Sequence, residues 1–160
     1  MRAAMRNKLL FGSLSLLLTL FGCKPSDPYS HYESIKKGEW SRDSWLAYAL
    51  DSLPVDPQLQ YDVILGIVNS NQYPYRNLWL RISQNFNDTV FVNDTIEIKL
   101  ADENGKWIGS GSAGLYQFTV PYKSGIRLDS TRSYSIHIRQ VMKDNPLKGI
   151  DKVGVMVKGS

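Results

Sequence analysis

The sequence predicts an all-β domain, built as an antiparallel β-sandwich of two sheets, with a jelly roll as one candidate topology. Three observations favour this fold class. Short apolar stretches recur about every ten residues with Asn, Asp, Gly and Pro between them. Two stretches alternate strictly between apolar and polar side chains, and no stretch shows sustained helical periodicity. The residues ahead of the domain predict a signal peptide.

The first 22 residues have the layout of an export signal. Arg2, Arg6 and Lys8 precede fourteen uncharged, mostly apolar residues, 9–22. This run is shorter than the roughly 20 residues that a helix needs to cross a bilayer. No second long apolar run follows it. We therefore expect no transmembrane span.

The end of the apolar run, Leu20-Phe21-Gly22-Cys23, resembles the bacterial lipobox. The resemblance implies cleavage before Cys23, a diacylglycerol on its sulfur and an acylated amine. Two or three acyl chains anchor a protein durably, whereas one binds only marginally. The alternative is a plain secretory signal followed by a free thiol. Since Cys23 is the only cysteine, no intrachain disulfide can form, and packing alone must hold the exported domain.

Composition argues against nucleic acid as a partner. The net charge of +4 belongs to the precursor, because residues 1–22 carry three of the 19 basic residues and none of the 15 acidic ones. The remaining 138 residues hold 16 basic and 15 acidic side chains, a net charge of +1. No basic run of the kind that follows phosphates is present. About 140 residues are enough for one domain with its own core.

The mature chain divides into a tether and a domain. Residues 23–37 are polar and interrupted by Pro25 and Pro28, which is typical of an extended, lipidated tether. Residues 38–160 are assigned to the β-sandwich. A short helix could lie within 39–50, and Asp102-Glu103-Asn104-Gly105 predicts a turn. The expected strands are 61–68, 78–82, 95–100, 134–139 and 153–157.

The sequence nominates no catalytic, metal or cofactor site, so we expect a protein that is not an enzyme. The two histidines are His31, in the tether, and His137, on the polar side of a strand. Zinc sites usually gather three or four ligands, which this count does not supply. The segment 109–113 superficially resembles a nucleophile elbow, but its fifth residue is Ala113 and no α/β framework surrounds it. No phosphate-binding loop is present.

Aromatic residues in polar loops are the more informative feature. Tyr73 and Tyr75 flank Pro74, and Trp107 follows the expected turn. Exposed rings of this kind could stack on sugar rings or anchor a protein partner. The alternative is that they close the ends of the sandwich core.

Several segments together resemble the gliding motility lipoprotein family GldH of the Bacteroidota. The resemblance implies an envelope lipoprotein associated with gliding motility and, through it, with type IX secretion. It supplies no catalytic residues. The matching segments occur in the family's order and are 71–78, 100–102 with 105–111, and 140–150 with Val153-Gly154.

Four short motifs resemble the O-glycosylation pattern of exported Bacteroidota proteins, in which Asp precedes Ser or Thr and usually a residue with a methyl group. The alternative reading is ordinary turn-into-strand chemistry, where Asp is common. The candidate acceptors are Ser52, Thr89, Thr95 and Ser130.

The residues after Cys23 bear on location. Lys24-Pro25-Ser26-Asp27 has no Asp at the second mature position and no cluster of acidic residues. We therefore expect the periplasmic face of the outer membrane, with the membrane as one partner and envelope proteins as others. The competing hypothesis is a carbohydrate-binding lipoprotein that uses Tyr73, Tyr75 and Trp107.

Overall fold

This computed structural model describes residues 29–159 of the chain. These residues form eleven strands and one short 3-10 turn, which are joined by loops. The signal peptide and Cys23 lie outside the described residues. No helix in residues 29–159 is long and apolar enough to cross a membrane. The elements are β1 (Tyr29–Ser34), the turn Lys36–Gly38, β2 (Glu39–Trp40), β3 (Leu46–Ala49), β4 (Tyr61–Ser70), β5 (Asn77–Gln84), β6 (Val92–Lys99), β7 (Ser110–Ser112), β8 (Leu115–Ile126), β9 (Ser135–Gln140), β10 (Leu147–Lys148) and β11 (Ile150–Gly159).

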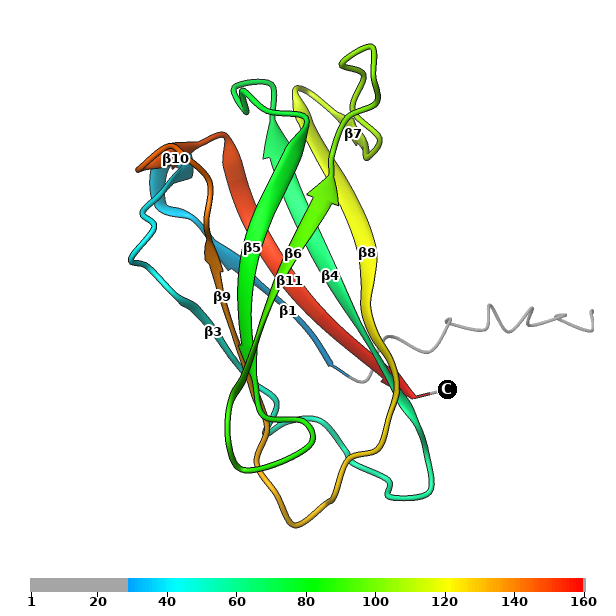
Figure 1. Cartoon of the computed structure of the whole chain (residues 1–160). Coiled ribbons are helices and arrows are strands. Elements are labelled where there is room, and N and C mark those ends of the chain that lie inside the picture. Colours follow the sequence, from blue (N-terminus) through cyan, green and yellow to red (C-terminus); the bar gives the residue numbers. More distant parts are fainter. Residues whose placement is uncertain (1–28, 160) are drawn as a thin grey trace, which may run out of the picture.

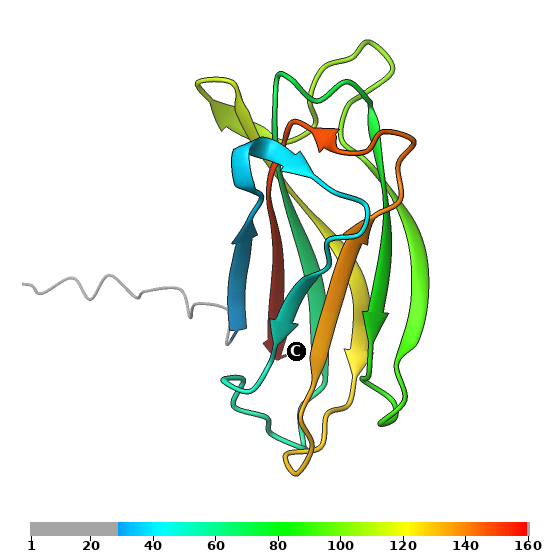
Figure 2. The same ribbon diagram turned by 90° about the vertical axis from the view of Figure 1, so that its left-hand side faces the viewer.

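The strands form two main sheets that pack face to face, as two layers in Figures 1 and 2. One sheet has the order β1-β11-β4-β8-β7, and the other has the order β3-β9-β5-β6. A small ribbon of β10 and β2 lies at one end. Each strand pairing is antiparallel. The predicted two-sheet antiparallel β-sandwich is confirmed.

The core lies between the two sheets and follows from side-chain alternation. In β4, Leu65 and Ile67 are fully buried, and on the facing sheet so are Leu80, Ile82 and Ile138. Successive side chains of a strand point to opposite faces, so one face of each sheet supplies the apolar layer. The five strands expected from sequence all coincide with strands of the structure: β4, β5, β6, β9 and β11.

The helix considered within residues 39–50 is absent from the described chain. This segment forms β2 and β3 instead, and β3 pairs with β9 along its length. β8 is a long strand that was not among those expected from the sequence. Tyr116, Phe118 and Tyr122 alternate with more exposed neighbours on β8. With Val120, these residues occur at every second position, and this period of two is the signal that could have identified the strand.

The predicted tether 23–37 is wrong from Tyr29 onward. Residues 29–34 form β1, which pairs with β11 from Tyr29 opposite Val157 to Ser34 opposite Lys152. The sandwich therefore begins at Tyr29 and not at residue 38. His31, expected in the tether, lies on β1, with its Nε2 atom 2.9 Å from Glu33 Oε1. β1 is a short edge strand with mostly exposed side chains, and such strands carry a weak hydrophobic signal.

Tyr32 of β1 lies across the outer face of the five-stranded sheet. Gly154 is its partner on β11, and Gly66 is the next residue across, on β4. A Cβ atom on Gly66 would lie 2.1 Å from Tyr32 Oη, and one on Gly154 would lie 2.5 Å from the ring. Gln117 Nε2 on β8 donates to Tyr32 Oη at 3.1 Å. The ring therefore covers two glycine backbones and connects the edge strand to three others.

Tyr32→Ala should lower the free energy of unfolding by about 1 to 3 kcal/mol, because it exposes the two glycines and removes the apolar ring. Urea denaturation measures this change. Tyr32→Phe is the matched control, since it keeps the ring and loses only the hydroxyl. An equal loss in both variants would contradict the covering role of the ring.

A polar link joins the two sheets where β6 faces β8. The Tyr122 hydroxyl donates to the Asp94 carboxylate, and Lys123 Nζ lies 3.2 Å from Asp94 Oδ2. The hydrogen bond from Tyr122 is the main cause that lowers the pKa of Asp94, and Lys123 adds to it. Burial, followed by the interaction with Asp94, raises the pKa of Tyr122.

The Asp94 link should make stability depend on acid pH. The folded pKa of Asp94 lies below the unfolded value of about 3.9. Its contribution is therefore present above pH 4 and is lost as the pH falls through the folded pKa. In Asp94→Asn, the unfolding free energy should be lower at pH 7 and should change less between pH 4 and pH 2.5. Chemical denaturation at several pH values measures both effects. Parallel pH profiles for the two proteins would contradict the assignment.

Candidate functional site

The loops of the sandwich gather at two opposite ends. Residues 71–76, 100–114 and 141–149 meet at the end where β1 finishes, and we call this the distal end (top in Figure 1). The opposite, proximal end holds Tyr29, where the described chain begins, and Gly159, where it ends. A ligand site at the distal end therefore lies at the end away from Tyr29.

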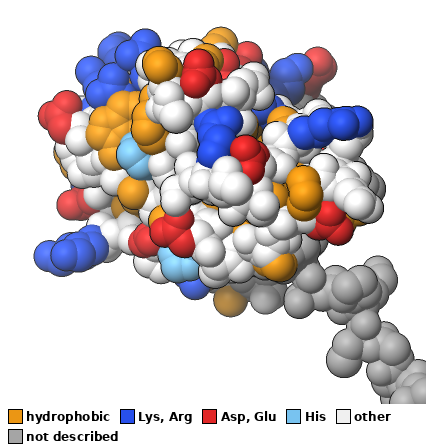
Figure 3. All heavy atoms as spheres, turned by 90° about the horizontal axis from the view of Figure 1, so that it is seen from below, with side chains coloured by type: hydrophobic (Ala, Val, Ile, Leu, Met, Phe, Trp, Pro, Cys, Tyr) orange, Lys and Arg blue, Asp and Glu red, His pale blue; other side chains and the backbone are white. Residues whose placement is uncertain are grey.

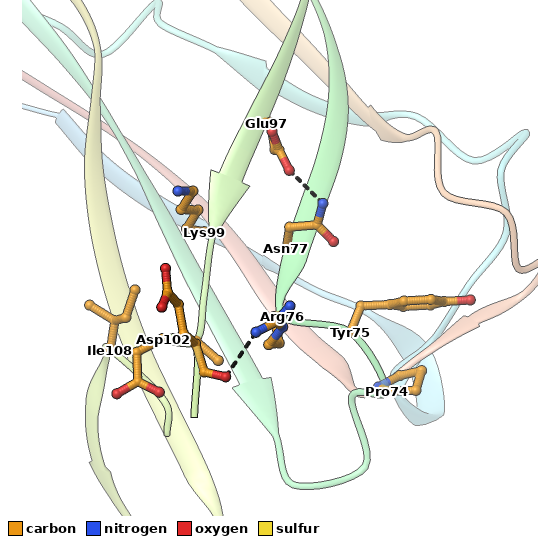
Figure 4. Close-up of a pocket in the computed structure, with 10 residues that line it drawn as sticks. Pro74, Tyr75, Arg76, Asn77, Glu97, Lys99, Asp102 and Ile108 are labelled. Atoms are coloured by element: carbon orange, nitrogen blue, oxygen red, sulfur yellow. Dashed lines mark hydrogen bonds between the residues drawn. The ribbon is translucent and has the colours of Figure 1, made fainter. Parts of the chain in front are cut away.

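The distal end contains a hollow of about 610 Å³. Arg76 ties its walls together: Nη1 donates to the Glu103 carbonyl at 2.9 Å, and the Arg76 carbonyl accepts from Leu100 and Ala101. The Asn77 side chain donates to Glu97 on the neighbouring strand (Figure 4). The lining mixes both charges with a few apolar side chains and comprises residues 74–77, Glu97, Lys99, residues 101–103 and Ile108.

Behind this hollow, Tyr73 fills the end of the core. Only 3% of its surface is exposed, and its hydroxyl donates to the Asn77 carbonyl at 2.6 Å. Its ring centre lies 5.9 Å from that of Tyr75 and 6.3 Å from that of Trp107. Burial raises the pKa of Tyr73. The prediction of Tyr73 as an exposed contact is therefore wrong, and the alternative, a ring that closes the core, is correct for this residue.

Gly149 fixes the backbone against which Tyr73 packs. Its φ is +85°, and a Cβ atom there would lie 2.3 Å from Tyr73 N. The Gly149 carbonyl accepts from Ser70 N at 2.9 Å, and Gly149 N donates to the Gly38 carbonyl at 3.0 Å. Three loops of the distal end thus meet at a position that has no space for a side chain.

Trp107 and Tyr75 are partly exposed, so both are still candidate contact residues. Trp107 Nε1 donates to Asn71 Oδ1 at 3.2 Å, and its ring packs against Tyr116. The predicted turn before Trp107 is confirmed, because Asp102 Oδ1 accepts from two backbone N–H groups and Gly105 has φ of +81°. A hydrogen bond with Asp144 is the largest of the effects that raise the pKa of Tyr75.

A second candidate surface, which sequence reasoning missed, is the outer face of the four-stranded sheet. Trp79 and Trp45 are 39% and 40% exposed there. Arg81 and Arg139 lie between them on β5 and β9. The signal was present in Leu78-Trp79-Leu80-Arg81-Ile82, where buried aliphatic residues alternate with an outward Trp and Arg. Two exposed tryptophans beside two arginines on one sheet face make this face a candidate contact surface.

Hydrophobic side chains also gather near the proximal end. Val90, Phe91 and Val92 are 66%, 40% and 47% exposed. Phe91 stacks on His137 with ring centres 5.3 Å apart, and Figure 3 shows hydrophobic side chains around a histidine on the face seen from below. His137 lies between buried Ile136 and Ile138, so its expected place on the polar side of a strand is confirmed.

The four candidate O-glycosylation acceptors are all exposed. Ser52, Thr89 and Ser130 lie in three loops of the proximal end, and Thr95 lies on the outer face of β6. Asp88 Oδ1 accepts from Thr89 N, a local bond that ordinary turns also make. Modification at these residues stays a prediction.

Within residues 29–159, no group of three or more His, Cys, Asp or Glu side chains is placed to hold a metal ion. The side chains of the distal loops and of the four-stranded sheet's outer face can stack, donate and accept hydrogen bonds and form ion pairs.

Taken together, these observations define a small antiparallel β-sandwich protein with candidate contact surfaces on its loops and on one sheet face. The family model of the GldH lipoprotein matches residues 27–157, and the chain belongs to this family. Family membership makes it a lipoprotein of the cell envelope. The predicted resemblance is confirmed.

Two relatives extend the match. A protein of Christiangramia forsetii named as a gliding motility lipoprotein GldH homolog is 30% identical over 90% of this chain and 91% of its own length. The gliding motility lipoprotein GldH of Flavobacterium johnsoniae is 24% identical over 88% of this chain and 90% of its own length.

Two solved structures are also similar, both at 10% sequence identity. One is a carbohydrate-binding module of the family 9 glycoside hydrolase Cel9A from Ruminococcus flavefaciens, with a TM-score of 0.49 over 83% of this chain and 99% of the other. The second is the CBM22-1 xylan-binding domain of Xyn10C from Paenibacillus barcinonensis, with a TM-score of 0.38 over 84% of this chain and 94% of the other.

Proposed function

We propose that this GldH-family lipoprotein is held on the periplasmic face of the outer membrane by acyl chains on Cys23. There it acts as a non-catalytic component of the gliding machinery and of the type IX secretion apparatus associated with it. The observation that carries the proposal is the family match over residues 27–157, together with relatives named as gliding motility lipoproteins. The protein acts by contact with envelope proteins.

The place of Tyr29 supports an oriented contact role. Six chain steps separate Cys23 from Tyr29, and an extended chain spans at most about 3.5 Å per residue. The proximal end is therefore held within about 20 Å of the lipid. β8 has 12 residues, and a strand of that length extends about 40 Å. An upright domain would carry the distal hollow and Trp107 well away from the membrane, where partners could reach them.

A clean deletion in a gliding host tests the function. We expect the deletion strain to form non-spreading colonies and to lose proteins that the type IX system exports to the medium, with both restored by a plasmid copy. Export and spreading must be scored separately, because loss of spreading alone would support the motility role and remove the secretion role. A strain that spreads and secretes like its parent would refute the proposal.

Location is tested independently of function. Membranes separated by density should place the protein in the outer-membrane fraction. In intact cells it should resist added protease and become sensitive once the outer membrane is permeabilised. Cleavage in intact cells would show that the domain lies on the cell surface. Recovery of the protein with the inner membrane would overturn the anchoring assignment.

Glycan binding has less support. Of the three rings that would form the platform, Tyr73 is buried and Trp107 is packed between Tyr73 and Tyr116. Only Tyr75 and Trp107 remain partly exposed. A glycan array in which the lipid-free domain gives a signal that Trp107→Ala abolishes would restore this function as a candidate.

A further inference from the structure

Two arginines face each other on the outer surface of the four-stranded sheet. Arg81 on β5 is the direct cross-strand partner of Arg139 on β9. Like charges directly opposite one another on a sheet are destabilising. The side-chain ion pairs among residues 29–159 join other residues, so neither arginine is paired with a carboxylate. Arg139 Nε is also buried without a hydrogen-bond partner.

Aromatic rings hold and flank this pair. The Arg139 guanidinium lies 4.7 Å from the ring centre of Trp45, a cation–π contact that restricts its position. Trp79 lies two residues from Arg81 on β5, so it projects from the same face. Tryptophan and arginine are the residue types most enriched among energetically dominant interface contacts.

Among the described residues, the rest of this face forms no ion pair with either arginine. Glu97 lies opposite Trp79, and its carboxylate accepts from the Asn77 side chain. Lys99 adds a further cation two residues along β6. β9 and β5 are inner strands of the order β3-β9-β5-β6, so their backbone groups are already paired. A ligand on this face must therefore be recognised through side chains.

We propose that this face, centred on Arg81 and Arg139 and flanked by Trp45 and Trp79, is the docking surface for an envelope protein whose contacting surface carries carboxylates. The inference rests on the proposed function, to which it adds the chemistry of the partner. A carboxylate between the two guanidinium groups would remove their repulsion and accept charge-assisted hydrogen bonds from both. The cation–π contact of Trp45 with Arg139 already occupies part of the Trp45 ring, which favours a protein surface over a stacked sugar ring.

Photocrosslinking in cells tests the proposal with the full lipidated chain. A photoreactive phenylalanine analogue replaces Ala47, an exposed residue on β3 beside His137 on the same face. The matched control carries the analogue at Thr119, exposed on the outer face of the other sheet. We expect a protein adduct at position 47 and none at 119, with the contacted peptide rich in Asp and Glu by mass spectrometry.

Charge variants decide whether the arginines cause the contact. The yield of the adduct should fall at least tenfold in the double variant Arg81→Glu/Arg139→Glu. The yield should be largely retained in the double variant Arg81→Lys/Arg139→Lys, which keeps both positive charges. Arg81→Ser should weaken the adduct without lowering the thermal midpoint of unfolding, because it removes a like-charge neighbour. A merely structural Arg81 would lower that midpoint.

Four results would overturn the inference: no adduct at position 47, an adduct that survives charge reversal, a contacted peptide without acidic residues, or an adduct to a glycan or lipid. The deletion strain separates this inference from the proposed function. A motility defect without the acidic contact refutes only the docking surface. A charge-dependent acidic contact in the complemented strain, combined with normal gliding and secretion in the deletion strain, refutes only the proposed function.

Discussion

Gly149→Ala should lower the free energy of unfolding by about 3 kcal/mol or more. Its Cβ atom would lie 2.3 Å from Tyr73 N and 2.6 Å from Tyr73 Cα. Backbone atoms cannot swing aside as the end of a side chain can. The φ of +85° adds about 1 to 2 kcal/mol for any residue with a Cβ atom. Urea denaturation of the purified variant measures the loss.

Gly105→Ala is the matched control for this effect. Gly105 has a similar φ of +81°, but a Cβ atom there would meet nothing within 4 Å. It should therefore cost only the conformational part, about 1 to 2 kcal/mol. The difference between the two variants isolates the packing of Tyr73 against Gly149. Equal losses would show that this packing contributes nothing to stability.

Cys23→Ala should release the protein from the membrane completely. Two or three acyl chains bind durably, and about 0.8 kcal/mol is lost for each CH₂ group no longer buried in the bilayer. Because Cys23 precedes β1 by six residues, the thermal midpoint of the domain should not change. Cell fractionation and mass spectrometry of the mature N-terminus measure the two outcomes.

Ser26→Ala provides the control for Cys23→Ala, since it alters the same segment and leaves the thiol. It should stay with the membrane and carry the same lipid mass as the parent. An unmodified Cys23 in the mature parent, or a leader still attached, would contradict lipid anchoring. Gliding and secretion by the Cys23→Ala strain would further show whether the domain needs its anchor or only its compartment.

The sequence predicts the strands that face the core well, for a physical reason. In β5, β6 and β9, one face of the strand packs on the core and the other faces solvent. The sequence of each strand therefore alternates between apolar and polar residues. β4 is buried along most of its length and reads as a continuous apolar run. The positions of these strands follow from which side chains are buried, and the apolar or polar type of each residue indicates this directly.

The features that escaped prediction depend on neighbours that are distant in sequence. β1 is ordered because Val153–Val157 of β11 supplies its hydrogen bonds, and its own side chains are mostly exposed. Tyr73 is buried because Gly149 allows close approach. Arg81 and Arg139 become a pair only in the register of β5 with β9. None of these relations is visible in a window of consecutive residues.

The pairing of β1 with β11 also determines how the domain would respond to force. A pull on the lipid at one end and on a partner at the other would run nearly along the strands, because β1 enters at the proximal end and lies beside β11 for six residues. Under that direction of load the hydrogen bonds of the pair are strained together in shear, and not opened one after another. A tether attached this way resists mechanical extraction, a useful property wherever an envelope component must bear tension.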